Sequence, residues 1–563
     1  MISTPSGLAL RAAGAALSLS LLLAALAPAA AQAQRTRRPA PRRPAPAAPK
    51  RPTPPAVPAE WRAALDHVSP ASLRGHLSFI ASDLLEGRRT PSRGLDIAAE
   101  YIAAQFRRAG LEPAGGDGTY FQAAEWAMTG REMRGFRLGF EGAGSLVVPA
   151  ERASIGQSLP GGGTTLWTPE GELALERVGA VKVAYGDAQA LAALTREQVE
   201  GRAVLTEIPS YQREGRERAP ALLREQNSFL VRMRELGAAV VVSFDRASER
   251  GRGGGSPRLV DPAAPQRPSP FGGQAAAPLV VAHGAETAKF YDSLPAGPTA
   301  AAVSLSVPAL ANTPARVRNV AGVLRGSDPA LRDEYVIVSA HYDHVGLKEN
   351  CRPGEDCIFN GANDDGSGTV GVVELAAALS GLKARPKRSI LFLAFFGEEL
   401  GLLGSRYYGR NPLVPLARTV AQVNLEQVGR TDDTEGPQVS SAAVTGFDLS
   451  DVGAVLAAAG EAAGVRVFKH PTKSDAFFPR SDNQALADVG VPAHTVSTAY
   501  EFPDYHGVGD EWQKVDYENM ARVLRAVGLG LLRLADAPQP PRWNESDPRT
   551  ARYVEAWRKL HEQ

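Results

Sequence analysis

The chain has 563 residues, of which 44% are hydrophobic and 22% charged, and its formal net charge is +1 at pH 7. A chain of this length and hydrophobic content can bury a large core and is expected to form two folded domains with extra segments. The first 58 residues contain basic but no acidic side chains, so the rest of the chain is net negative. A net negative body argues against a nucleic-acid-binding protein.

The N-terminus predicts an exported protein. Arg11 precedes the apolar run ALSLSLLLAALAPAA and AQA at 31–33, which is the pattern of a secretory signal peptide over residues 1–33. The apolar stretch is too short and too poorly flanked to predict a membrane anchor. Residues 34–58, rich in Arg, Pro and Ala, are expected to form an extended linker, with contact to an anionic envelope surface as the alternative. We therefore expect a periplasmic or secreted protein without stable membrane insertion after signal cleavage.

The middle of the chain differs in character from the rest. From about residue 145 to 300, glycine-rich turns alternate with short predicted strands at GRAVLTEIP (201–209) and AAVVVSF (238–244). A helix is expected between them at 221–237. A stretch of this length lies within the usual size range of a domain, so we expect a β-rich insert here.

Three later segments are predicted strands of a parallel sheet. YVIVSAH (335–341), SILFLAFF (389–396) and TVAQVNLEQ (419–427) are apolar runs of the kind found in buried parallel strands. TVGVVELAAAL (369–379) has apolar residues at helical spacing and follows the glycine-rich turn GANDDGSG (361–368). In an open α/β sheet the carboxyl ends of parallel strands meet at one edge, where ligands bind. Polar residues that follow these strands are therefore expected to share one site.

Histidines and carboxylates follow these strands in the pattern that a paired zinc site requires. Two divalent metals in one pocket need one bridging carboxylate, plus one imidazole and one further carboxylate for each metal. The candidate metal ligands are His341, Asp364, Glu399, Glu426 and His506. Glu398 is left as the candidate general base, because a metal lowers the pKa of bound water from about 15.7 towards about 7 and a nearby carboxylate can take the remaining proton. Asp343 is expected to accept the second imidazole N–H of His341 and fix its tautomer.

Each of these features alone has a structural interpretation. A histidine that ends a strand is usually packed, a Glu-Glu pair is usually solvated, and Asp-Asp beside glycine is usually a turn or a helix cap. The occurrence of five such elements together, in this order along the chain, favours a metal site. His344 is interpreted as a neighbour of the site or a surface residue, and His470 and His494 as structural. Serine hydrolase chemistry is not predicted, since no G-x-S-x-G elbow follows a strand.

The chain resembles the co-catalytic di-zinc aminopeptidase family, which includes bacterial leucyl aminopeptidases and belongs to a superfamily with glutamate carboxypeptidases and glutaminyl cyclases. The opening segment from Leu77 to Gly115 resembles the family's first helices. The matching motifs, in family order, are AHYD (340–343), NDDGSG (363–368), GEELG (397–401), NLE (424–426) and YH (505–506).

The resemblance implies two Zn²⁺ per chain. By that resemblance, His341 and Glu426 would hold one zinc ion, Glu399 and His506 the other, and Asp364 would bridge them. Tyr505 matches the family position proposed to stabilise the oxyanion of the tetrahedral intermediate.

The resemblance also implies an α/β fold with a mixed, mostly parallel sheet sandwiched by helices, and a β-rich protease-associated domain inserted into it. The expected order is a signal peptide, a linker, the first part of the catalytic domain, the insert, the metal-binding part and a C-terminal tail. The corresponding boundaries are 1–33, 34–58, 59–144, 145–300, 301–536 and 537–563.

Two positions depart from the family pattern. Glu426 stands where Asp is usual, and its longer side chain can still reach a metal. Asn483 stands where the histidine of an SDH motif is frequent, so any role of that histidine is absent. Neither change removes a required ligand.

The function expected from this resemblance is that of an exported zinc metallo-exopeptidase that removes N-terminal residues from peptides with a free N-terminus. The alternatives are a related zinc carboxypeptidase or dipeptidase, a glutaminyl cyclase, and, from another class, a non-catalytic binding relative. The last would be marked by missing ligands, and none is missing. Side-chain preference and oligomeric state are not predicted.

The only two cysteines, Cys351 and Cys357, frame the short segment RPGED between the first two predicted ligand loops. In an oxidising compartment such a loop favours a disulfide. A thiolate metal site is the alternative, although no nearby histidine pair would complete it.

Overall fold

The computed structural model describes residues 57–142, 144–158, 165–166, 171–209, 219–249, 257–263, 276–348 and 351–562. The predicted signal peptide and nearly all of the predicted linker lie outside the described residues. Pro54–Gln563 form one compact unit, and the elements below belong to it.

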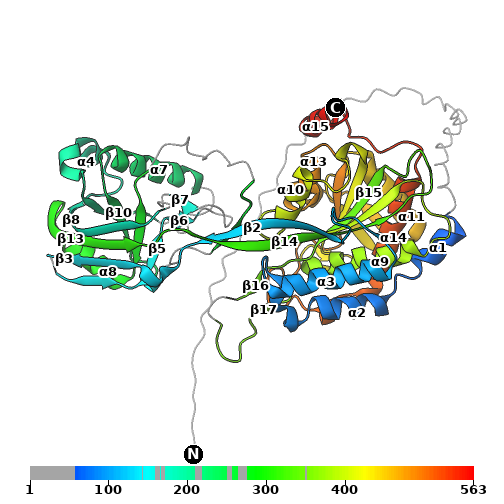
Figure 1. Ribbon diagram of the computed structural model, residues 1–563, viewed down its shortest axis with the longest axis horizontal. Helices are drawn as coiled ribbons and strands as arrows, with labels where there is room; N and C mark the ends of the chain where they lie inside the picture. Colours follow the sequence, from blue (N-terminus) through cyan, green and yellow to red (C-terminus); the bar gives the residue numbers. More distant parts are fainter. Residues whose placement is uncertain are drawn as a thin grey trace, which may run out of the picture. The chain divides into compact units, whose positions relative to one another are not determined.

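A ten-stranded mixed sheet forms the centre of the larger part of the fold (Figure 1). Its strands in spatial order are β11 (Arg258–Val260), β2 (Phe121–Gly130), β14 (Ala311–Leu324), β18 (Ser389–Phe395), β15 (Tyr335–His341), β19 (Thr419–Leu425), β24 (Ala493–Ser497), β22 (Ser441–Val444) and β23 (Arg466–Phe468), and β1 (Glu112–Pro113) pairs with β14. The strands β18, β15, β19 and β24 pair in parallel, as do β22 and β23, while the remaining pairs are antiparallel. The sheet is therefore mixed, and its parallel part is the centre that the apolar runs predicted.

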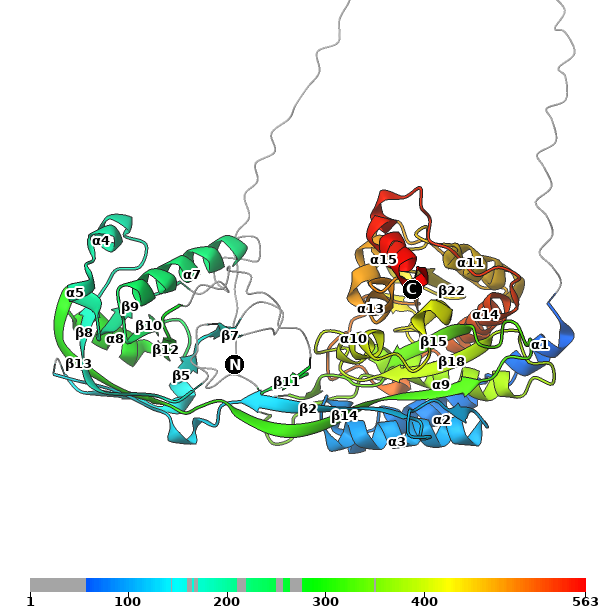
Figure 2. The ribbon, with the colours of Figure 1, turned by 45° about the horizontal axis from the view of Figure 1, so that its top comes forward.

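The central strands are buried on both faces, which explains their continuous apolar sequences. In β15, Val336 and Val338 join one hydrophobic core, whereas Tyr335 and Ile337 join another, because successive side chains of a strand point to opposite faces. Helices cover both faces of the sheet (Figures 1 and 2). The first core includes α1 (Ala59–Leu65), α2 (Pro70–Ile80), α3 (Arg93–Arg108), α9 (Gly368–Ser380), α11 (Asp451–Ala463) and α14 (Tyr517–Asp536), and the second includes α10 (Leu403–Arg410), α13 (Asn483–Ala487) and α15 (Ala551–His561).

The helices begin where polar side chains can cap them. The side chain of Ser92 accepts a hydrogen bond from the backbone N–H of Leu95 at the start of α3. Asp516 does the same for Asn519 at the start of α14. Such caps satisfy N–H groups that have no partner within the helix.

A second sheet of eight strands is formed mainly by the middle of the chain. In spatial order it contains β4 (Leu146–Val148), β3 (Arg137–Glu141), β13 (Gly297–Val307), β8 (Leu173–Lys182), β9 (Ala203–Thr206), β10 (Val240–Asp245), β12 (Leu279–His283) and β5 (Ala153–Ile155). The predicted strands at 201–209 and 238–244 correspond to β9 and β10, and the predicted helix at 221–237 to α7 (Ala219–Glu235). The sheet has hydrophobic cores of its own. It begins before residue 145 and ends after residue 300, so it extends beyond both expected boundaries.

The remaining elements are short. They are α4 (Ala188–Ala193), α5 (Arg196–Val199), α8 (Ala285–Ser293), α12 (Lys473–Ala476), β6 (Gln157–Ser158), β7 (Thr165–Leu166), β16 (Gly346–Leu347), β17 (Ile358–Phe359), β20 (Asp432–Asp433) and β21 (Gly436–Pro437). Cys351 and Cys357 are joined by the predicted disulfide. Across the described ranges, no helix combines the length and the apolar character needed to cross a bilayer.

Candidate metal centre

Three parallel strands deliver candidate residues to one edge of the central sheet. β15 ends at His341, which pairs in register with Phe395, the last residue of β18. Glu398 and Glu399 follow β18 after a turn, and Glu426 comes directly after β19. Because the three strands run in the same direction, the side chains that follow them gather at their shared carboxyl end.

The turn before α9 brings Asp364 to the same edge. The carboxylate of Asp510 accepts hydrogen bonds from the backbone N–H groups of Asn363 and Asp364 at 3.0 Å. The carboxylate of Asp365 accepts from the N–H groups of Gly368 at 2.9 Å and Gln427 at 3.2 Å. These bonds tie the turn to the loops that follow β19 and precede α14.

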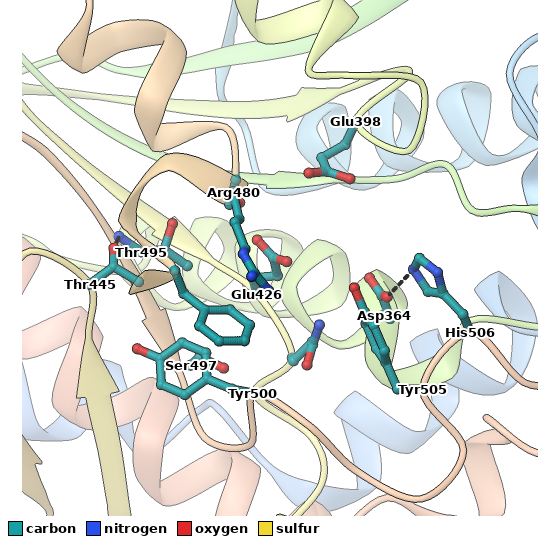
Figure 3. A pocket seen from close by; sticks show the side chains of 13 residues that line it. Asp364, Glu398, Glu426, Thr445, Arg480, Thr495, Ser497, Tyr500, Tyr505 and His506 are labelled. Carbon is teal, nitrogen blue, oxygen red and sulfur yellow. Dashed lines mark hydrogen bonds and ion pairs between the residues drawn. The ribbon is translucent and has the colours of Figure 1, made fainter. Parts of the chain in front are cut away.

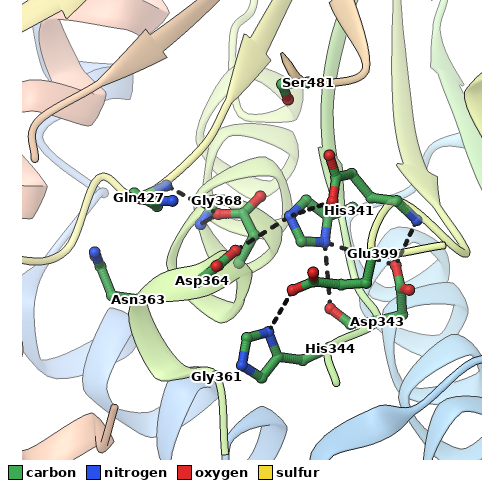
Figure 4. Close-up of polar contacts among 12 residues, drawn as sticks. His341, Asp343, His344, Gly361, Asn363, Asp364, Gly368, Glu399, Gln427 and Ser481 are labelled. Carbon is green, nitrogen blue, oxygen red and sulfur yellow. Dashed lines mark hydrogen bonds and ion pairs between the residues drawn. The ribbon is translucent and has the colours of Figure 1, made fainter. Parts of the chain in front are cut away.

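The carboxylate of Asp364 lies between two imidazoles. Its Oδ1 is 3.4 Å from Nε2 of His341, and its Oδ2 is 3.2 Å from Nε2 of His506 (Figures 3 and 4). Nε2 of His506 is also 3.3 Å from Oε2 of Glu399. All five residues predicted as ligands therefore converge, because ligand atoms of Glu426 lie within 4.8 Å of those of His341 and Asp364.

A sixth residue, His344, also belongs to this group. Its side chain is buried, and its Nδ1 lies 2.8 Å from Oε1 of Glu399 (Figure 4). His344, Asp364 and Glu399 form a second cluster of donor atoms within 4.8 Å of one another. His506, by contrast, is 40% exposed and approaches the same two carboxylates from the pocket. Of the two interpretations from the sequence, a neighbour of the site or a surface residue, the structure supports the first, because His344 is buried and contacts a candidate ligand.

The donor set fits divalent cations. Buried atoms without a hydrogen-bond partner include Nε2 of His341, Oδ2 of Asp364, Oε1 of Glu399 and Oε2 of Glu426. Buried carboxylates without donors are costly unless a positive charge compensates them. Imidazole nitrogens and carboxylate oxygens at this spacing are suitable ligands for zinc.

In the protein without metal, the close approach of these buried carboxylates shifts their pKa values. Burial and repulsion from Asp364, opposed by His341, raise the pKa of Glu426 to about 7. Burial also raises the pKa of Glu398, and the nearby Glu426 adds to that rise. Burial by itself would raise the pKa of Asp364, but the nearby imidazoles of His341 and His506 hold it below its usual value.

The two residues assigned to the chemistry lie beside this cluster. Oε2 of Glu398 is 4.0 Å from Nε2 of His341. The ring of Tyr505 stacks on His506 with 4.2 Å between ring centroids, and its side chain is partly exposed. For Asp343, the hydrogen bond from Nδ1 of His341 goes to the backbone carbonyl at 3.2 Å, while the carboxylate is 3.6 Å away.

A pocket of about 470 Å³ opens over the cluster (Figure 3). Its lining includes Asp364, Glu398, Glu426, Tyr505 and His506 on the side of the candidate ligands. The other lining residues, which form the rest of the wall, are Gln427, Thr445, Phe477, Arg480, Ser481, Thr495, Ser497 and Tyr500.

Arg88 holds together the loops that carry the candidate ligands, and no sequence pattern predicted this role. Its fully buried guanidinium donates hydrogen bonds of 2.6–2.9 Å to the backbone carbonyls of Ile80, Tyr342, Asn360 and Gly361. It therefore joins the loop after β15 to the turn that carries Asp364. Burial lowers the pKa of Arg88 to about 10, although nearby acids including Asp343 oppose that shift. Arginine within the opening helices was visible in the sequence, but nothing there indicated burial.

Known proteins resemble the chain in this region. Residues 319–529, which contain all the candidate ligands, match the model of peptidase family M28. Aminopeptidase YwaD of Bacillus subtilis is 38% identical over 97 residues, covering 17% of this chain and 18% of that protein. A probable zinc metalloprotease of Pyrenophora teres f. teres is 32% identical over 123 residues, covering 22% of this chain and 25% of that protein. The matches thus span about a quarter or less of these curated relatives.

Solved structures align over more of the chain at lower identity. An aminopeptidase from Aneurinibacillus sp. strain AM-1 is 18% identical, with a TM-score of 0.49, and the alignment covers 86% of this chain and 97% of that one. The zinc aminopeptidase BSAP from Bacillus subtilis is also 18% identical, with a TM-score of 0.47 and coverage of 84% and 97%. Residues 319–529 of the chain are therefore similar to peptidase family M28.

Proposed function

We propose that this protein is an exported zinc-dependent aminopeptidase that hydrolyses N-terminal residues from peptides. The observation that carries the proposal is the carboxylate of Asp364 between the imidazoles of His341 and His506, beside buried Glu399 and Glu426. This arrangement is suited to two cations that share one acidic residue.

The proposed ligand sets follow the two sides of Asp364. His341 and Glu426 would hold one zinc ion, Glu399 and His506 would hold the other, and Asp364 would be shared by both half-sites. The 2.8 Å contact between His344 and Oε1 of Glu399 orients the carboxylate whose other oxygen, Oε2, approaches His506. A histidine in this position fixes the carboxylate that it contacts, as outer partners of metal ligands generally do.

Glu398 is proposed as the general base. Bound zinc supplies water of lowered pKa and polarises the scissile carbonyl. Glu398 takes the proton from the attacking water and passes it to the leaving amine. Burial raises the pKa of Glu398 above its ordinary value, which favours a carboxyl group that can hold a proton between these two steps.

Tyr505 and the acidic pocket complete the proposed mechanism. Burial raises the pKa of Tyr505, with the nearby acids adding to the rise, so its phenol stays protonated and can donate a hydrogen bond to the developing oxyanion. The acidic lining of the pocket is proposed to attract the free N-terminal ammonium group of the peptide.

The domain organisation is part of the proposal. The expected bounds assign residues 59–144 and 301–536 to a catalytic domain and 145–300 to a protease-associated insert, and the strands β3 and β13 extend that insert beyond both bounds. The eight-stranded sheet and the separate hydrophobic cores of the middle region support this division. The Cys351–Cys357 disulfide supports export, since disulfides persist in oxidising compartments.

A zinc carboxypeptidase or dipeptidase is the second candidate. It is favoured by one observation, the presence of Arg480 in the wall of the pocket. Arginine is well suited to bind a carboxylate, as a carboxypeptidase would require.

The test uses aminoacyl anilides and their N-acetylated counterparts, with and without a zinc chelator. If the protein is an aminopeptidase, it should hydrolyse only the free-amine substrates, and the chelator should abolish that hydrolysis. Equal hydrolysis of the acetylated substrates would contradict dependence on the free amine, and chelator-resistant hydrolysis would contradict the metal centre.

A further inference from the structure

One cation in the pocket wall takes no part in the proposed hydrolysis. Arg480 is the one arginine or lysine among the described residues that line the pocket. Its side chain is exposed and extends toward the interior of the pocket (Figure 3). Phe477 and Ser481 also line this pocket. The acids Asp364, Glu398 and Glu426 line the same cavity, so the pocket presents both negative and positive groups.

The guanidinium of Arg480 is available to a ligand. Across the part of the chain that the structure describes, Arg480 forms no ion pair with a carboxylate. Among the described residues, its side chain interacts with Phe477, whose ring centroid lies 4.4 Å from Cζ of Arg480. Stacking on an aromatic face leaves the N–H groups at the edge of the guanidinium plane free to donate hydrogen bonds.

The segment that carries Arg480 is held firmly. The hydroxyl of Ser481 accepts a hydrogen bond of 2.8 Å from the side chain of Asn424 in β19. Asp482 accepts a hydrogen bond from Ser405, and Asn483 donates one of 3.0 Å to the carbonyl of Phe478. Since these partners are buried, the backbone at Arg480 has a defined position relative to the strand that precedes Glu426.

We infer that Arg480 binds a carboxylate of the substrate, so that the enzyme prefers peptides with a carboxylate close to the scissile bond. This inference rests on the proposed aminopeptidase function. The carboxylate has two sources, the side chain of an N-terminal Asp or Glu and the C-terminal carboxylate of a dipeptide. In both cases the pocket acids attract the ammonium group while Arg480 pairs with the negative group, and the same charge disfavours an N-terminal Lys or Arg.

The test compares substrates that differ only in the carboxylate. One arm measures kcat/KM for Glu, Gln, Leu and Lys p-nitroanilides, and the other measures it for Ala-Ala and Ala-Ala amide. The zinc-loaded protein is expected to favour the carboxylate-bearing member of at least one pair by about tenfold or more, the size typical of a charge-assisted hydrogen bond. Arg480→Gln should bring that ratio close to one.

Two further variants sharpen the result. Arg466→Ala removes an arginine that also stacks on a phenylalanine, with 4.2 Å between its Cζ and the ring of Phe468, but that does not line the pocket, so the ratio should persist. Arg480→Glu should have a higher kcat/KM for the Lys anilide than for the Glu anilide. A variant that merely fails to fold would not gain this preference.

The outcomes separate the inference from the function on which it rests. Chelator-sensitive hydrolysis of the Leu anilide with ratios near one in the unmodified protein, or with ratios unaffected by Arg480→Gln, overturns the role of Arg480 alone. Absence of chelator-sensitive hydrolysis for every substrate overturns the proposed function and this inference together.

Discussion

The backbone N–H of Glu398 donates a hydrogen bond of 3.1 Å to Oδ1 of Asp343. Asp343 is fully buried and lies two residues after the end of β15, whereas Glu398 lies beyond the end of β18. The bond therefore couples the loop of one candidate ligand, His341, to the candidate base. Asp343 therefore links the loop after β15 to the loop after β18, and it also lies next to the imidazole of His341.

Glu398→Gln should leave the zinc content unchanged while lowering kcat by about a hundredfold to ten-thousandfold, the usual contribution of a general base. The amide keeps the size of the side chain but takes no proton. Elemental analysis and steady-state kinetics provide the two measurements. Glu374→Gln, a change at a buried glutamate in α9, is the control for general damage to the core. Full turnover in the Glu398 variant would refute the assignment.

Asp364→Asn should reduce the bound zinc to less than one equivalent per chain, because both proposed half-sites use this carboxylate. Elemental analysis after gel filtration measures the content. Asp292→Asn, which changes an exposed residue of α8, should keep the full content. Retention of two zinc ions by the Asp364 variant would exclude a bridging role.

Arg88→Met should weaken both folding and metal retention, because four backbone carbonyls lose their shared donor. Leaving buried acceptors unpaired is expected to lower the free energy of unfolding by about 3 kcal/mol. Chemical denaturation measures the stability, and the rate of zinc release to a chelator measures the effect on the site. The adjacent Arg89 is exposed, so Arg89→Met is a matched control. Equal zinc release from the two variants would limit Arg88 to a structural role away from the metals.

His494 should make stability depend on pH. Its buried ring contacts the hydroxyl of Ser450 at 2.6 Å and the carbonyl of Thr445 at 2.8 Å, and burial lowers its pKa to about 4. In the unfolded chain its pKa is about 6.5, so between these values the unfolded state binds more protons than the folded state. The free energy of unfolding therefore falls as the pH falls below about 6.5, by about 2 kcal/mol at pH 5.

This dependence is measured by denaturation of the metal-free protein at pH 7.5 and pH 5. His494→Gln should reduce the difference in unfolding free energy between the two pH values, whereas a change at exposed His561 should not. An identical difference in His494→Gln and the unmodified protein would show that His494 does not contribute to it.

The predictions from the sequence agree best with the structure where a local run of apolar residues specifies a buried element. The run from Tyr335 to His341 predicted a strand with the same bounds as β15. The end of such a run also indicates where the chain leaves the sheet, which explains why His341, Glu399 and Glu426 were recognised as neighbours. Asp364 followed from a glycine-rich turn before an apolar helix, a second local signal.

Residues that act through distant contacts had no such signal. The sequence around His344 indicates only a polar residue in a loop, but its side chain is buried and contacts Glu399. Arg88 lies 254 residues from Tyr342 in sequence, but it donates a hydrogen bond to the carbonyl of that residue. Arg480 faces the pocket only because the segment after α12 packs against β19.

The amino-acid sequence by itself determined the central strands, the set of candidate ligands and the resemblance to a family, because periodicity and motif spacing are local properties of the chain. Only the tertiary structure decided which side chains share the site, which acids lack a donor, and which cation faces the pocket. Those properties depend on how separate loops pack at one edge of the sheet, and burial and pairing there are set by partners that lie tens to hundreds of residues away in the sequence.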